Sequence, residues 1–223
     1  MDSWIIMSDS QARSIPYLKN VSKSRWNVEL RMSEVIEKNG GMWTTMGIIR
    51  GNKLYCSIEE TLFLAERGAL LVLDANDAIL TLKHMYEMVS DGGNGCSWDS
   101  FKAFRHLKSL GYIVGRHETP WILKHNKRDI HENSGISDIK LEENFSITKL
   151  KPVFDIYLPN SNFRKSSPGA PGFVLCLARY PPSKAEMDDL DRRCNGATLK
   201  ICNVEHGHVS FFSFNGIELP VLP

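Results

Sequence analysis

Histidine and cysteine side chains that could bind a metal or act as nucleophiles are dispersed along this chain of 223 residues. The five cysteines show no CxxC spacing, and an odd, scattered set is typical of reduced thiols in a protein core. The one close pair of histidines, His206 and His208, flanks Gly207 in a predicted hairpin turn. Because a zinc site needs several converging ligands, we predict neither a metal site nor a cofactor.

Tyr157 ends a predicted strand at residues 154–157, where a phenol could take part in proton transfer. A tyrosine in this position more often packs its ring and hydrogen-bonds its hydroxyl. The loop that follows contains no histidine, but it carries the basic pair Arg164 and Lys165, which could make weak contacts to RNA phosphates or simply be solvated.

The composition is that of an ordinary soluble globular protein, with 42% hydrophobic and 24% charged residues. The net charge of +1 gives no global field that would attract nucleic acid. No apolar run approaches a membrane span, and residues 1–7 lack the features of a signal peptide. We therefore expect a soluble protein with no membrane partner, and the sequence carries no clear localisation signal.

The first group of elements predicts a mixed α/β domain at residues 25–124, after a lead-in at residues 1–24. Short strands are expected at 26–30, 43–49, 53–55 and 70–73. Ser57 and Glu60 form a capping box that begins one helix, and Asp77 is expected to open a second. A third helix at 97–110 ends at Gly111 and leads into a strand at 112–114. This end resembles a winged-helix unit, and a simple helix–strand corner is the plainer alternative.

The second group predicts a mixed-sheet domain at residues 151–223, after a polar linker at 125–150. Strands are expected at 154–157, 173–178, 198–204 and 209–214, with a helix opened by a capping box of Ser183 and Glu186. Asn215 and Gly216 give a strong hairpin signal. The apolar strand at 209–214 would invite pairing with another chain. The fold class is therefore α/β of the α+β kind.

Several segments match one family in order. They are residues 42–47, 57–64, 104–114, 154–157, 163–165, 168–169 and 204–214. Together they resemble the non-catalytic structural subunit of the eukaryotic tRNA-splicing endonuclease, the subunit that pairs with the one cutting the 5′ splice site.

The resemblance implies an incomplete catalytic site. Active members of the family are thought to use a tyrosine, a histidine and a lysine. Tyr157 stands at the tyrosine position, Gly169 or Ala170 at the histidine position, and Ala197 or Thr198 at the lysine position. We therefore expect Tyr157 to be a remnant, and the chain to be no enzyme but a scaffold for catalytic subunits that remove introns from precursor tRNA.

The resemblance also implies partner-binding residues. The turn residues are expected to insert into the opposite half of a nuclear heterotetramer, and the following apolar strand and tail to contact a catalytic subunit. These residues are Glu205, His206, Gly207 and His208 for the turn, and Val209, Phe211, Phe212, Phe214 and Leu219 for the strand and tail.

Two alternative functions remain open. An active RNA endonuclease could combine Tyr157 with His206 or Lys200. A winged-helix nucleic-acid-binding protein would instead use Arg105, Lys108 and Arg116.

Overall fold

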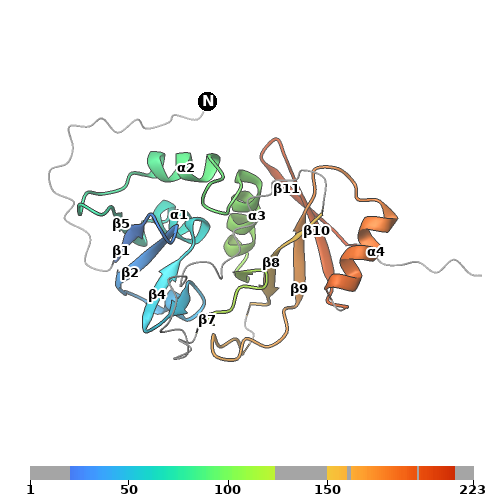
Figure 1. Cartoon of the computed structure of the whole chain (residues 1–223), viewed down its shortest axis with the longest axis horizontal. Helices are drawn as coiled ribbons and strands as arrows, with labels where there is room; N and C mark the ends of the chain where they lie inside the picture. The colour runs from blue at the N-terminus through green and yellow to red at the C-terminus, as the bar shows by residue number, and fades with distance from the viewer. Residues whose placement is uncertain (1–20, 124–149, 160–161, 195, 214–223) are drawn as a thin grey trace, which may run out of the picture.

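The computed structural model describes residues 21–123, 150–159, 162–194 and 196–213 (Figure 1). These residues form two mixed β-sheets and four α-helices, so the predicted α+β class is confirmed. None of the helices in the described ranges has the length and apolar content that crossing a membrane requires.

The first sheet has the strand order β5-β1-β2-β4-β3-β7. β1 pairs with β5, and β3 with β7, in parallel, and the other pairs are antiparallel. The helix α1 packs on this sheet, and its Ile58 and Leu62 belong to the same hydrophobic core as Trp26 and Val72. The elements in chain order are β1 (Ser22–Asn27), β2 (Met32–Glu37), a 3-10 helix (Gly41–Thr44), β3 (Ile48–Arg50), β4 (Lys53–Cys56), α1 (Ile58–Glu66), β5 (Leu70–Leu73), α2 (Leu82–Ser90) and β7 (Ile122–Leu123).

The second sheet has the order β11-β10-β9-β8-β6 and is covered by a helix on each face. Figure 1 shows α3 between the two sheets and α4 on the outer side. Phe173 and Leu175 of β9 face the α3 side, whereas Val174 and Cys176 pack with Leu190 of α4. The elements are α3 (Trp98–Ser109), β6 (Ile113–Arg116), β8 (Pro152–Tyr157), β9 (Phe173–Leu177), α4 (Lys184–Arg193), β10 (Leu199–Glu205) and β11 (His208–Phe212).

The chain changes sheets twice before residue 124. After α3, β6 pairs with β8 of the second sheet, and β7 then returns to β3 of the first. The strand expected at 112–114 therefore joins the second sheet and forms no local wing hairpin. One hydrophobic core includes residues of α1, α3 and both sheets, such as Leu62, Phe104 and Phe154, so the two groups of elements share their interior.

Three predicted boundaries are corrected by local hydrogen bonds. The strand expected at 26–30 is β1 at Ser22–Asn27, so it begins within the predicted lead-in. It ends at Asn27 because the side-chain oxygen of this residue accepts the N–H of Leu30 at 2.8 Å and closes a turn. Residues 43–49 begin in the 3-10 helix before β3. Asp77 has φ +64 and lies in a turn around Asp74, so α2 begins only after Thr81.

The predicted capping boxes are present at α1 and α4. The carboxylate of Glu60 accepts the N–H of Ser57 at 3.0 Å and the N–H of Gly47 at 2.7 Å, so it fixes both the helix start and the preceding turn. Residues 1–20 of the lead-in, residues 125–149 of the predicted linker, the Asn215–Gly216 signal, Phe214 and Leu219 lie outside the described residues.

Candidate functional site

Tyr157 lies in a closed aromatic cluster at the end of β8. Its ring makes edge contacts with Trp121 and Phe163, at centroid distances of 6.3 and 5.0 Å. Only 7% of the residue is exposed. Burial raises the pKa of Tyr157, opposed by a hydrogen bond with the Trp121 side chain. A phenol in this state stays protonated near neutral pH.

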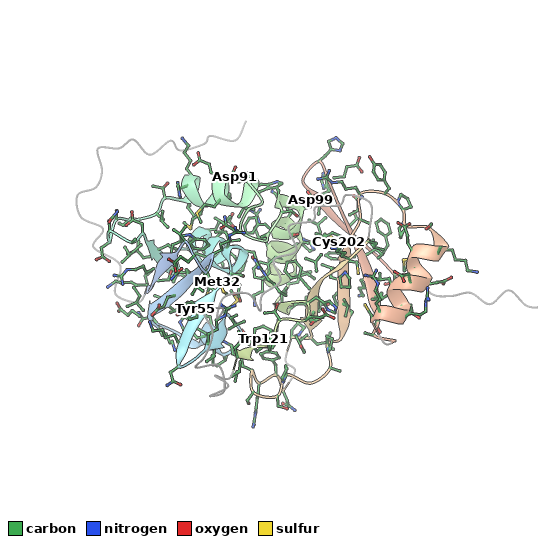
Figure 2. The ribbon with its side chains drawn as sticks, viewed as in Figure 1. Met32, Tyr55, Asp91, Asp99, Trp121 and Cys202 are labelled. Carbon is green, nitrogen blue, oxygen red and sulfur yellow. The ribbon has the colours of Figure 1, made fainter. Side chains whose placement is uncertain are left out.

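A glycine makes room for this cluster. Trp121, labelled in Figure 2, lies over Gly115 of β6. A Cβ at position 115 would stand 2.7 Å from Cζ2 of Trp121, closer than packed atoms approach. Gly115 therefore allows the indole to lie on the sheet beside Tyr157.

The two candidate partners of Tyr157 lie elsewhere in the second sheet. The Lys200 ammonium sits 4.4 Å from the ring centroid of Phe173, on the face that packs against α3. Ile156 also faces α3, so the next residue along β8, Tyr157, points to the opposite face.

His206 is at the other end of the sheet from Tyr157. Tyr157 lies where β9 and β10 begin, because Ile156 pairs with Phe173 and Leu199 pairs with Val174. His206 follows the last residue of β10. Neither His206 nor Lys200 therefore takes the place of a catalytic partner beside Tyr157.

The structure contains a histidine–carboxylate pair that was not predicted. His117 Nδ1 lies 2.6 Å from Asp155 Oδ1, and Asp155 is on the same face of β8 as Tyr157. The hydrogen bond with Asp155 raises the pKa of His117, partly opposed by burial. The two residues are 38 positions apart, and only the pairing of β6 with β8 brings them together.

The basic pair in the loop before β9 divides between two environments. Arg164 is exposed. The ammonium of Lys165 turns toward the first sheet and donates to the carbonyl of Met46. Burial lowers the pKa of Lys165, opposed by the nearby charge of Glu60. RNA contact by these residues stays a prediction, and Arg164 is the more accessible of the two.

The predicted turn residues come together at the tip of the β10–β11 hairpin. Glu205 pairs with His208, and His206 and Gly207 form a two-residue turn with φ values of +48 and +82. Positive φ at both turn residues gives the turn a twist that matches the twist of the two flanking strands. Gly207 adopts positive φ without strain. All four residues are exposed, so the tip is free to meet another surface.

The strand β11 ends the second sheet within the described residues and has two unlike faces. Phe211 packs inward, with its ring 5.6 Å from that of His106, and Val209 also contacts the core. Phe212 is 52% exposed. It lines a groove of about 550 Å³ with Tyr180, Pro181 and the tip residue His208. Of the predicted interface residues that the structure describes, Phe212 and the tip are therefore the ones most open to solvent.

The three cations of the winged-helix alternative do not form one exposed surface. Arg116 makes two contacts of 2.7 Å to the buried carboxylate of Glu59. Arg105 pairs with Glu66 at 3.2 Å. Burial lowers the pKa of Lys108, opposed by the charge of Glu60. Arg105 and Arg116 thus connect α3 and β6 to α1.

Comparison with known proteins finds similarity to one kind of protein. Residues 10–74 match the family described as the N-terminal part of tRNA-splicing endonuclease subunit sen54. The tRNA-splicing endonuclease subunit SEN54 of Eremothecium gossypii is 29% identical over 114 residues, which cover 46% of this chain and 24% of that protein. The subunit Sen54 of Mus musculus is 23% identical over 128 residues, which cover 57% of this chain and 23% of that protein. The chain thus aligns with about a quarter of the length of each of these relatives.

Proposed function

We propose that this chain, which is Sen54-like as its sequence predicted, is a non-catalytic subunit of a tRNA-splicing endonuclease. In this role it supports the removal of introns from precursor tRNA by holding catalytic subunits in place. The similarity to proteins named as subunits of this endonuclease supports membership of the complex. The non-catalytic role rests on the surroundings of Tyr157 and on the positions of Lys200 and His206.

The closed surroundings of Tyr157 carry this proposal. Cleavage through a 2′-hydroxyl needs a base, an acid and a cation close to the reacting phosphate. The Tyr157 ring is instead packed between Trp121 and Phe163, and its pKa is raised by burial. Lys200 faces the other side of the sheet, and His206 lies at its far end. These positions favour a structural tyrosine over a catalytic one.

The open edge of the second sheet supports a role in assembly. β11 has an unpaired side among the described residues, and an edge strand with an apolar flank can pair with another chain. Phe212 and Tyr180 are 52% and 79% exposed beside it. We assign this edge and the 205–208 tip to contacts with sister subunits of a heterotetramer in the nucleus.

A cleavage assay tests the catalytic half of the proposal. The purified chain alone should leave precursor tRNA intact, and the chain combined with catalytic subunits should give cut exons. Tyr157→Phe should leave the rate of the assembled complex unchanged, because the hydroxyl does not touch the reacting atoms. Cleavage by the chain alone that disappears in Tyr157→Phe would overturn the proposal.

A co-purification experiment tests the assembly half. Phe212→Glu should reduce recovery of the catalytic subunit while leaving the melting temperature of the isolated chain unchanged, since the side chain is half exposed. Ile79→Glu is the matched control, because Ile79 is 58% exposed on the first half of the chain. Equal recovery with both variants would remove the 208–212 edge from the interface.

A further inference from the structure

The loop before β9 presents a serine followed by a proline at the surface. Ser167 is exposed and precedes Pro168. Its backbone N–H donates to the carbonyl of Arg164 at 2.9 Å, which closes a turn over these four residues. In such a turn the first and last Cα atoms lie within ~7 Å of each other. The Ser167 hydroxyl and the Arg164 side chain therefore project from neighbouring points of the loop.

Among the described residues, Arg164 is a cation without a carboxylate neighbour. No acidic side chain in the described ranges lies within ion-pair distance of its guanidinium, and the residue is exposed. Lys165 differs, because its ammonium is held by the Met46 carbonyl. The turn therefore places the Arg164 guanidinium, which has no ion-pair partner among the described residues, beside the accessible hydroxyl of Ser167.

We propose that Ser167 is a phosphorylation site for a proline-directed serine/threonine kinase and that Arg164 binds the phosphate across the turn. The kinase transfers the γ-phosphoryl group of ATP to Oγ of Ser167. The new P–O bond replaces the bond to ADP, which leaves, and the hydroxyl proton passes to the base of the kinase. A phosphoserine carries about −1.5 to −2 charges and three strong acceptor oxygens, which an arginine fork can bind in pairs.

The modification would neutralise the positive charge of the loop. Arg164 and Lys165 give this segment a local charge of about +2, which one phosphate reduces to roughly zero. Phe163, one residue before Arg164, packs against Tyr157. The change therefore falls at the end of the second sheet where β9 and β10 begin, away from the 205–208 tip. This inference goes beyond the proposed function and does not depend on it.

Phosphorylation in vitro tests the acceptor. The full chain is incubated with ATP and a purified proline-directed kinase, and the modified residue is identified by mass spectrometry. We expect phosphate at Ser167, lost in Ser167→Ala and in Pro168→Ala and retained in the matched control Ser166→Ala. Both serines are exposed, so an unmodified Ser167 in the presence of active kinase, or equal labelling of Ser167→Ala, would overturn the assignment.

A ³¹P NMR titration tests the role of Arg164 on the fully phosphorylated chain. The second ionisation of phosphoserine has a pKa of about 6, and a bound guanidinium should lower it. We expect Arg164→Gln to raise this pKa by roughly 0.2–0.7 pH units, the size of an exposed ion pair. Arg192→Gln, a substitution of an exposed arginine on α4, should leave it unchanged. Identical titration curves for the wild type and Arg164→Gln would overturn the assignment of Arg164.

Discussion

At the scale of single residues, Gly115 determines whether the aromatic cluster around Tyr157 can form. Gly115→Ala should destabilise the protein by about 1–3 kcal/mol, because the added methyl meets Trp121 at 2.7 Å. Urea unfolding measures the loss. Gly93→Ala is the control, since a methyl group at position 93 would meet nothing within 4 Å. Equal stability of Gly115→Ala and the wild type would mean that Trp121 does not rest on the sheet.

The His117–Asp155 pair should give the protein a stability that depends on pH. The pKa of His117 is raised in the folded state by its hydrogen bond with Asp155. The stability that this pair contributes is therefore fully present below about pH 6.5, the pKa of a histidine in the unfolded chain. It is lost as the pH rises through the pKa of His117 in the folded protein. His117→Gln should thus destabilise the protein more at about pH 6 than at about pH 8.5, in urea unfolding at both pH values.

A second histidine serves as the reference for that comparison. His84 is on the surface of α2, with its side chain 57% exposed and 3.9 Å from Glu87. His84→Gln should change stability little at either pH, because exposed ion pairs contribute little. A destabilisation by His117→Gln that does not vary with pH would show that the charge of His117 takes no part.

At the scale of elements, α4 depends on its N-terminal cap. Ser183 Oγ accepts the N–H of Glu186 at 3.3 Å, and the Glu186 carboxylate accepts the N–H of Ser183 at 2.8 Å. Ser183→Ala should reduce the free energy of unfolding by about 1 kcal/mol, with a range of about 0.5–2. Thermal unfolding followed by circular dichroism measures it, and Ser183→Asp should restore most of the loss because aspartate also caps helices. Equal unfolding curves for Ser183→Ala and the wild type would count against the cap.

Some elements with local signals were predicted from the sequence, and others were missed. The capping boxes at Ser57 and Ser183 and the tight turn at residues 206–207 each depend on interactions within four residues. The late start of α2 was missed because the Asp74 side chain takes up the backbone groups of the following turn. The 3-10 helix at 41–44 is stabilised by similarly short-range bonds, such as Thr44 Oγ1 to the Gly41 carbonyl.

Contacts between residues far apart in the sequence could not be predicted, because they depend on how the strands pair. Tyr157 was placed correctly at a strand end, but its neighbours Trp121 and Phe163 are brought to it by the pairing of β6 with β8 and by the loop before β9. The same holds for His117 beside Asp155 and for Lys165 on Met46, 119 positions away. Nothing in the local pattern around these residues specifies such partners.

At the scale of the molecule, the two sheets are joined through their interior. Leu62 of α1, Phe104 of α3 and Phe154 of β8 belong to one continuous core. The buried ion pair between Glu59 of α1 and Arg116 of β6 crosses the same boundary. Because neither sheet could separate without exposing this core, we expect the described part of the chain to unfold as a single cooperative unit.

The Glu59–Arg116 pair offers a test of whether the two sheets unfold together. Burial raises the pKa of Glu59, but the charge and hydrogen bonds of Arg116, together with hydrogen bonds from the backbone and Ser57, lower the pKa overall. Arg116→Leu leaves this carboxylate, only 2% exposed, without its partner, and should cost about 3–5 kcal/mol in urea unfolding. The double variant Glu59→Leu/Arg116→Leu should cost less, because it removes both charges.

The control for the buried pair is the exposed pair of Lys23 and Glu37, whose atoms lie 2.9 Å apart with side chains about half exposed. Lys23→Leu should destabilise the protein far less than Arg116→Leu does, because exposed ion pairs contribute little. Amide hydrogen exchange in β2 and β9 then reports the two sheets separately. Since the sheets share a core, Arg116→Leu should lower protection in both by the same free energy. Faster exchange in only one sheet would show that the two sheets open independently and that the Glu59–Arg116 pair stabilises only one of them.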